Sequence, residues 1–231
     1  MRDNAELLYK PDNVYIGEWH YQWLELRNGL INASTVYKIM SDSVRKYKGA
    51  TPIQNYAKDV VQSIIEGVGD GYTNQDMENG NAFERDALEE FERRHKTFLA
   101  QLTFLKVGDY VGISSDGLEC NLEFGVEVKS PHFKGFSNYC NAIDAGVETF
   151  KNVFPEAYGQ MQTAIWGYNF DYYYFVAFHS KDYQKGDKQN AKDRYIEMKI
   201  PKDNEYQDKL SIRIEETIKL IKNELEIYKK I

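Results

Sequence analysis

FGVEVKSP, at residues 124–131, alternates apolar and charged side chains before a proline ends the pattern. Successive side chains of a β-strand point to opposite faces, so Val126 and Val128 should lie on one face and Glu127 and Lys129 on the other. Two interpretations fit this alternation. The charged face belongs either to an ordinary solvated strand or to a reaction site, and a Glu-x-Lys tripeptide taken alone is more often the former.

A second carboxylate precedes this strand. Asp116 lies eleven residues before Glu127, within Ser115-Asp116-Gly117. An Asp-Gly pair favours a tight hairpin, so we expect this turn to join two strands and to bring both carboxylates to one end of a sheet. Two carboxylates and a nearby backbone carbonyl suit a hard cation such as Mg²⁺. A lysine on the same face can orient a water or stabilise charge developing on a phosphate.

Two expected helices carry further polar candidates. In the helix at about 76–95, Glu84 falls on the apolar face, where an acid is costly unless it is paired or ligates something. The alternative is a partly exposed glutamate favoured by the helix dipole. In the helix at about 155–167, Gln160 and Gln162 lie about 200° apart, so only one of them can face a site. An isolated glutamine is more often a surface or hydrogen-bonded buried amide.

The stretch WLELRNGLINAS, at residues 23–34, combines an arginine before a turn with a serine at a helix start. We expect Arg27 to end a helix at about 17–27 and a second helix to run from about 33 to 40, capped by Asn32 or Ser34. A helix N-terminus is a natural anion site, and an arginine can clamp a phosphate bidentately. The alternatives are a plain N-cap for the serine and a surface ion pair for the arginine.

The remaining pattern predicts a mixed fold. Helices come first, then a strand cluster interrupted by one helix, then a final helix, which suggests a mixed sheet with helices on both faces in the α/β or α+β class. The charged segment 179–194 should be a solvated hairpin loop. The other expected elements are helices at about 53–66 and 205–230 and strands at about 98–106, 109–115, 118–123, 124–130, 171–178 and 195–201.

Composition limits the alternatives. The 231 residues are 42% hydrophobic, which predicts one sizeable core and a single domain. No run approaches the roughly 18–20 apolar residues of a membrane span, and the first residues lack the apolar middle of a secretory signal, so we expect a cytosolic protein. The net charge of −7 argues against bulk electrostatic binding of nucleic acid but not against a local basic groove. Lys38, Arg45, Lys46 and Lys48 could track a phosphate backbone or form a solvated loop.

In their order along the chain, five motifs resemble the lambda-exonuclease family, also called the YqaJ-like viral recombinases, of the PD-(D/E)xK nuclease superfamily. The matching stretches are LRNGLINAS (26–34), MENGNAFERDALEEFE (77–92), GISSDGLE (112–119), GVEVKSP (125–131) and AYGQMQTAIW (157–166). Together they are far more specific than any one motif.

The resemblance implies a restriction-endonuclease-like α/β (α+β) core with a central mixed β-sheet flanked by helices. The single nuclease domain over residues 1–231 would comprise N-terminal helices at 17–66, a catalytic core at 76–180, and a C-terminal hairpin and helix at 181–231.

The resemblance also implies a metal centre. Asp116 and Glu127 would bind the divalent cation with the backbone carbonyl of Val128, and Glu84 would complete the acidic cluster as a further candidate ligand. The cofactor would be Mg²⁺, with Mn²⁺ as a substitute, at one or two ions per active site.

The other motif residues take substrate roles by the same resemblance. Lys129 would activate or orient the attacking water, and Gln160 rather than Gln162 would support the lysine and the substrate. Arg27 and Ser34 would bind the 5′-terminal phosphate. The chain departs from the family pattern at three positions, with serine at 115 where proline is usual, serine at 130 where cysteine is frequent, and Tyr158 only two residues before the first glutamine.

The activity implied is a 5′→3′ exonuclease that degrades one strand of linear double-stranded DNA and leaves 3′ overhangs for recombination by strand annealing. Family members form ring-shaped trimers and work beside a single-strand annealing protein, in the bacterial host cytoplasm if phage-encoded. Two alternatives stay open: a structure-selective endonuclease of the same superfamily, and a non-catalytic DNA-end-binding recombination adaptor.

Overall fold

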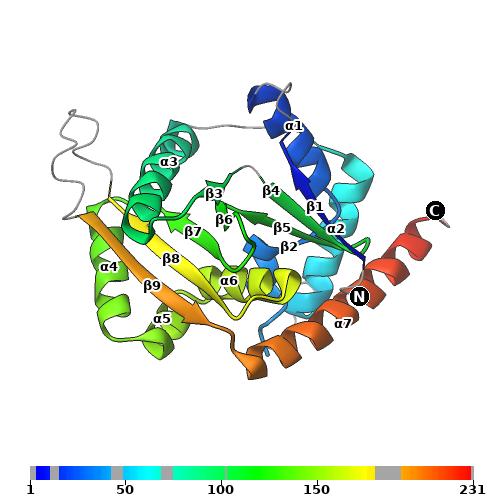
Figure 1. The fold of residues 1–231 in the computed structure, drawn as a ribbon. Helices are drawn as coiled ribbons and strands as arrows, with labels where there is room; N and C mark the ends of the chain where they lie inside the picture. Colours follow the sequence, from blue (N-terminus) through cyan, green and yellow to red (C-terminus); the bar gives the residue numbers. More distant parts are fainter. Residues whose placement is uncertain are drawn as a thin grey trace.

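The structure is a computed structural model that describes residues 4–10, 16–42, 49–68, 75–101, 103–179 and 194–229, with the side chains of 16–20 and 75–82 excepted. Over this part of the chain, helices surround two mixed sheets (Figure 1). The predicted α/β class with helix-flanked mixed strands is therefore confirmed, although one central sheet was expected. That the whole chain forms a single domain stays a prediction.

The first sheet has the strand order β1-β4-β5-β2. Only the short β2 pairs in parallel, along β5. Its strands are β1 (Ala5–Tyr9), β4 (Thr103–Val107), β5 (Val111–Ser115) and β2 (Ile31–Asn32).

The second sheet has the order β3-β6-β7-β8-β9 and contains the strand of the opening motif. β7 lies in parallel beside β8, while the other neighbours are antiparallel. Its strands are β3 (Leu99–Ala100), β6 (Gly117–Glu119), β7 (Gly125–Lys129), β8 (Tyr172–Phe178) and β9 (Tyr195–Pro201).

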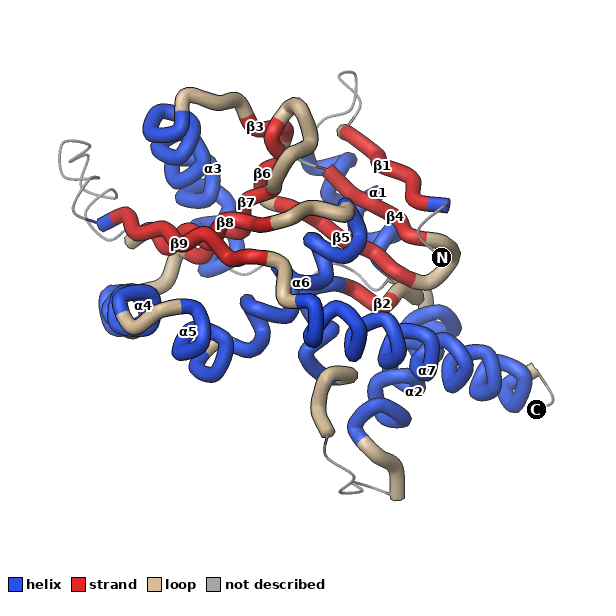
Figure 2. Tube along the Cα trace, turned by 60° about the horizontal axis from the view of Figure 1, so that its bottom comes forward, coloured by secondary structure: helices blue, strands red, loops and turns tan. Residues whose placement is uncertain are grey.

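The helices cover the two faces of this second sheet (Figure 1). α3 packs against β7 and β8 on one face, and α4 and α6 contact β8 from the other. Figure 2 shows α6 crossing between the sheets, and it contacts strands of both. The helices are α1 (Ile16–Arg27), α2 (Pro52–Glu66), α3 (Gln75–His95), α4 (Phe133–Asp144), α5 (Val147–Val153), α6 (Pro155–Tyr168), α7 (Asn204–Tyr228) and the 3-10 helix η2 (Ala33–Lys38).

The predicted hairpin at Ser115-Asp116-Gly117 is wrong. β5 ends at Ser115 in the first sheet and β6 begins at Gly117 in the second, so Asp116 marks a crossing between sheets. A two-residue type I′ turn needs positive φ, which Gly117 does not adopt. A Cβ at Gly117 would lie 3.0 Å from Leu99 and 3.1 Å from Leu88, so the glycine serves close packing under α3.

The other predicted helices and strands differ less from those in the structure. The helix predicted at about 33–40 is the 3-10 helix η2, and the strand predicted at about 98–106 is divided into β3 and β4. β1, α4 and α5 were not predicted. Most of the charged connection expected at 179–194 lies outside the described residues.

The alternation in β7 decides which side chains enter the core. Val126 and Val128 are buried with Leu88 and Phe91 of α3, as predicted, so the strand presents Glu127 to the opposite face. A larger core lies under α6 and includes Leu210, Ile214 and Ile221 of α7. Within the described residues, no helix combines the length and apolarity needed to cross a membrane.

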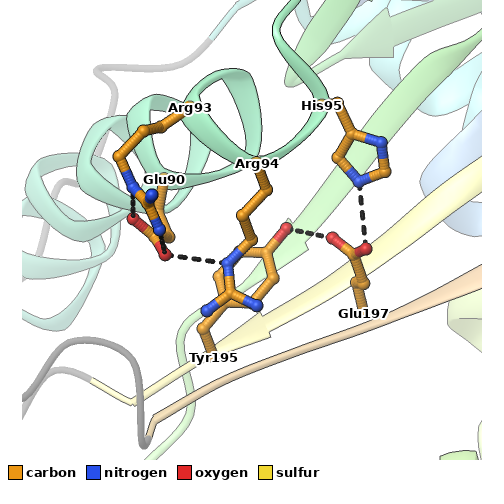
Figure 3. Close-up of polar contacts among 6 residues, drawn as sticks. All are labelled: Glu90, Arg93, Arg94, His95, Tyr195 and Glu197. Atoms are coloured by element: carbon orange, nitrogen blue, oxygen red, sulfur yellow. Dashed lines mark hydrogen bonds and ion pairs between the residues drawn. The ribbon is translucent and has the colours of Figure 1, made fainter.

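A polar network fixes the C-terminal end of α3 to β9 (Figure 3). The Tyr195 hydroxyl donates to Glu197 at 2.5 Å, and His95 Nε2 lies 2.9 Å from the other oxygen of that carboxylate. Arg94 donates to Glu90 at 2.7 Å and lies over the Tyr195 ring, 4.1 Å from its centroid. These contacts hold the helix that carries Glu84 against the second sheet.

Candidate active site

The site forms where the chain passes from the first sheet to the second. The backbone N–H of Val128 donates to the Asp116 carboxylate at 2.7 Å, so the crossing residue is tied to β7. The N–H and C=O of one strand residue point to the same side of the strand. The carbonyl of Val128 therefore also points toward Asp116 and away from β8.

Glu127 lies at the centre of the site and is 1% exposed. The Lys129 ammonium donates to its Oε1. Gln160 of α6 donates to its Oε2 at 2.6 Å. Lys129 and Gln160 thus reach one carboxylate, and Gln160 rather than Gln162 is the glutamine that lies beside it. Gln162 instead donates to the Pro201 carbonyl at 2.8 Å, away from the site.

The carboxyl groups of the cluster repel one another. Burial, together with Asp116 and Glu127, raises the pKa of Glu84 to about 9. Burial and Asp116 raise the pKa of Glu127 to about 7, against the pull of Lys129. Burial also raises the pKa of Asp116. Burial by itself would lower the pKa of Lys129, but Glu127 and Asp116 raise it above its ordinary value, so the ammonium is retained.

The donor set fits a hard cation in its chemistry. Asp116, Glu127 and Glu84 offer carboxylate oxygens, Val128 points a carbonyl to the same side, and repulsion among the acids would be relieved by a positive ion. Among the residues that the structure describes, however, no three side chains of His, Cys, Asp or Glu are grouped closely enough to hold an ion. In this structure the Lys129 ammonium forms an ion pair with the Glu127 carboxylate.

Arg27 and Ser34 form a second polar group. Arg27 Nη2 donates to the Ser34 hydroxyl at 3.0 Å, and the arginine lies within electrostatic range of Glu127. Asn32, not Ser34, occupies the N-cap position of η2, so the plain N-cap interpretation of the serine is wrong. Burial lowers the pKa of Arg27. The two residues predicted to bind a terminal phosphate are therefore adjacent and close to the acidic cluster.

Sequence reasoning missed two residues of this group. The Arg27 guanidinium lies 4.2 Å from the centroid of the Trp23 ring, and the Trp23 indole donates to Ser114 at 2.7 Å. Trp23 and Arg27 are four residues apart on α1, a spacing that could have suggested contact. Ser114 comes two residues before Asp116 on β5, so this chain of contacts joins the arginine to the strand that leads into Asp116.

Other candidates lie apart from the cluster. Tyr158 is buried and its hydroxyl donates to Asp203 at 2.8 Å, so it is not available to a substrate. Lys38 is exposed on η2, and the rest of the predicted basic stretch, at positions 45, 46 and 48, lies outside the described residues.

Comparisons with known proteins identify a family model that matches the chain and solved structures with a similar fold. The family model of the YqaJ-like viral recombinase domain matches residues 22–171, more than half of the chain. The fold resembles an alkaline exonuclease (LHK-Exo) from Laribacter hongkongensis, with a TM-score of 0.72 and 18% identity over 91% of this chain and 96% of that one. The same enzyme in complex with dAMP gives a TM-score of 0.71 at 19% identity, covering 91% and 96%.

A phage-related exonuclease from Haemophilus somnus 129PT gives a TM-score of 0.65 at 14% identity, over 89% of this chain and 99% of that one. At these identities the likeness shows a shared fold. No curated protein matches the chain.

Proposed function

This chain belongs to the YqaJ-like viral recombinase domain family, and from that premise we propose that it is an exonuclease acting on the ends of linear double-stranded DNA. It removes nucleotides from the 5′ end of one strand and leaves a 3′ overhang for recombination by strand annealing. The observation that carries the proposal is the arrangement around Glu127, where Lys129, Gln160 and the Asp116-bound strand meet.

The acidic cluster would hold a divalent cation, Mg²⁺ or Mn²⁺, in one or two copies. The ligands would be Asp116, Glu127 and the Val128 carbonyl, with Glu84 as a further donor. When bound, such an ion lowers the pKa of a water and neutralises charge developing on the phosphate. Each oxygen of Glu127 accepts one hydrogen bond and has a second lone pair, so the carboxylate could bind the ion while Lys129 and Gln160 still donate to it.

The chain's own side chains then divide the remaining work. Lys129, kept charged beside Glu127, orients the attacking water and stabilises charge on the phosphate. Gln160 fixes the Glu127 carboxylate from α6. Arg27, backed by Trp23 and beside Ser34, registers a 5′-terminal phosphate bidentately. This register gives the 5′→3′ direction.

The assembly around this activity is also part of the proposal. A ring-shaped trimer would keep the enzyme on its DNA, and a single-strand annealing protein would take up the 3′ overhang. Cross-linking with mass measurement, with and without duplex DNA, tests the trimer separately from the chemistry.

The decisive experiment uses linear duplex DNA with a label at one 5′ end and closed circular DNA of the same sequence. With Mg²⁺ we expect mononucleotides from the linear DNA and no cutting of the circle. Cutting of the circle would favour the endonuclease alternative. Binding of ends without hydrolysis would favour the adaptor.

Variants assign the activity to the site. Asp116→Asn and Lys129→Ala should each lower the rate of DNA loss by about a hundredfold or more. Asp116→Asn weakens the binding of the cation, and Lys129→Ala removes positive charge beside the phosphate. Asp144→Asn, the same change at an exposed residue at the end of α4, is the matched control. Unchanged Mg²⁺-dependent DNA loss in both site variants would disprove this assignment.

A further inference from the structure

Tyr139 of α4 is a partly buried tyrosine whose ring is held by phenylalanines. Its ring stacks on Phe154 with centroids 4.1 Å apart and lies 5.0 Å from Phe175 and 6.4 Å from Phe150. A ring packed on several sides has few orientations open to it, so the position of its hydroxyl is largely fixed.

This packing places Tyr139 beside the site. Phe175 of β8 is the register partner of Glu127 on the parallel strand β7, so their side chains share one face of the sheet. Tyr139 packs on Phe175 from that same face. Its hydroxyl is within electrostatic range of both the Lys129 ammonium and the Glu127 carboxylate.

The Tyr139 hydroxyl differs from the other donors of the site because those donors already make hydrogen bonds. Lys129 and Gln160 both donate to Glu127, and Arg27 donates to Ser34. Within the described part of the chain, the Tyr139 hydroxyl has no hydrogen-bond partner. Burial raises the pKa of Tyr139, so the phenol keeps its proton at neutral pH and remains a donor.

We propose that Tyr139 is a further catalytic residue, whose hydroxyl donates a hydrogen bond to a non-bridging oxygen of the phosphodiester being cleaved. The assignment rests on the proposed function. In the hydrolysis, the attacking water loses one proton as its oxygen forms the new bond to phosphorus. The bond between phosphorus and the 3′ oxygen of the terminal nucleotide breaks, and that oxygen takes up one proton from solvent, so that one water is added in total. The phenol keeps its own proton and stabilises the negative charge on the non-bridging oxygen.

The first measurement compares Tyr139→Phe with the wild-type protein on 5′-phosphorylated duplex DNA. The substitution keeps the ring and its packing, so the thermal unfolding midpoint should not change. We expect kcat to fall about 10- to 100-fold with little change in KM, because the hydrogen bond strengthens as charge develops. Tyr174→Phe is the matched control, since Tyr174 is also partly buried among aromatic rings but packs with α3 on the opposite face.

The second measurement separates contact with the substrate from support of the fold. The phosphodiester to be cleaved carries sulfur at one non-bridging oxygen, as each of the two pure diastereomers. For one diastereomer, sulfur should slow the wild-type protein more than it slows Tyr139→Phe, because the variant has no hydrogen bond left to weaken. Equal sulfur effects in both proteins for both diastereomers would overturn the assignment, even if Tyr139→Phe is slower.

The controls keep the two proposals apart. If the wild-type protein is active and Tyr139→Phe is equally active, the role of Tyr139 is overturned and the exonuclease proposal stands. A wild-type protein that removes no nucleotides overturns the exonuclease proposal together with it.

Discussion

At the scale of single residues, the environment of Glu127 makes a charge costly there and supplies groups that offset the cost. The side chain is 1% exposed, and each of its oxygens accepts a hydrogen bond, from Lys129 and from Gln160. An unpaired buried carboxylate would take up a proton instead. Each oxygen also keeps a second lone pair, with which it could bind a cation without losing its hydrogen bond.

Glu84 gives a pH prediction for the metal-free protein. Its pKa is about 9 in the folded state and near 4.5 when unfolded, so between these values the folded state binds the extra proton. The free energy of unfolding should therefore decrease as the pH rises from about 5 to about 9. Glu127, with a pKa of about 7, acts in the same direction.

Chemical denaturation in a metal chelator, repeated at several pH values, measures this slope. Glu84→Gln cannot ionise, so its stability should depend less steeply on pH than that of the wild-type protein. Equal slopes for the two proteins would contradict the burial and repulsion assigned to Glu84.

Ser114 gives a prediction about recognition of the DNA end. Ser114→Ala removes the acceptor of the Trp23 indole, which backs Arg27. One neutral hydrogen bond is worth about 1 kcal/mol, so the preference of kcat/KM for 5′-phosphate over 5′-hydroxyl ends should fall about fivefold. Ser114→Thr keeps a hydroxyl and is the control. An equal loss of kcat/KM on both kinds of end would exclude this role.

At the scale of the elements, the C-terminal helix is fixed to the layer that presents Gln160. Asp203 caps α7 by accepting from the Tyr206 N–H at 3.0 Å, and it also accepts from Lys151 of α5 at 2.7 Å and from Tyr158 of α6. Gln162 of α6 accepts from the Asp203 N–H at 3.1 Å. Three helices therefore meet at one carboxylate.

Asp203→Ala tests this junction. Loss of a helix cap alone costs about 0.5–2 kcal/mol, and we expect the free energy of unfolding to fall by about 1–2 kcal/mol. Asp203→Asn keeps a capping oxygen but loses the ion pair with Lys151, so it should cost less. Urea denaturation of the three proteins checks the order, and an Asn variant no more stable than the Ala variant would contradict the capping role.

At the scale of the whole molecule, α6 packs against strands of both sheets, and it carries Gln160 to the Glu127 carboxylate of the second sheet. The C-terminal end of α6 can approach the first sheet closely only if it carries a small residue there. A Cβ at Gly167 would lie 2.3 Å from Ile113 and 3.2 Å from Leu105, both buried in the first sheet. The glycine sets how near this helix lies to the sheet.

Gly167→Val tests that packing. Overfilling a packed core costs about 1–3 kcal/mol, and the unfolding free energy should fall by about that amount. Ile113→Ala opens space at the same point, so the double variant should lose less stability than the sum of the two single variants. Additive losses would show that Gly167 and Ile113 do not meet.

The sequence by itself determined which side chains share one face of a strand or of a helix. Alternation in FGVEVKSP put Glu127 and Lys129 on one strand face, and helical spacing allowed only one of Gln160 and Gln162 to face them. These patterns are readable because they depend on the geometry of a single strand or helix, which repeats every few residues.

Only the tertiary structure decided which distant segments meet. The contact of Trp23 with Ser114, 91 residues apart, the crossing between sheets at Asp116, and the position of Tyr139 over Phe175 follow no local period. Asp-Gly favoured a hairpin locally, but pairing of β6 with β7 and β3 prevailed. Strand pairing and core packing depend on the whole chain. Each strand or helix must bury its apolar face against another element, and its local sequence does not specify which one.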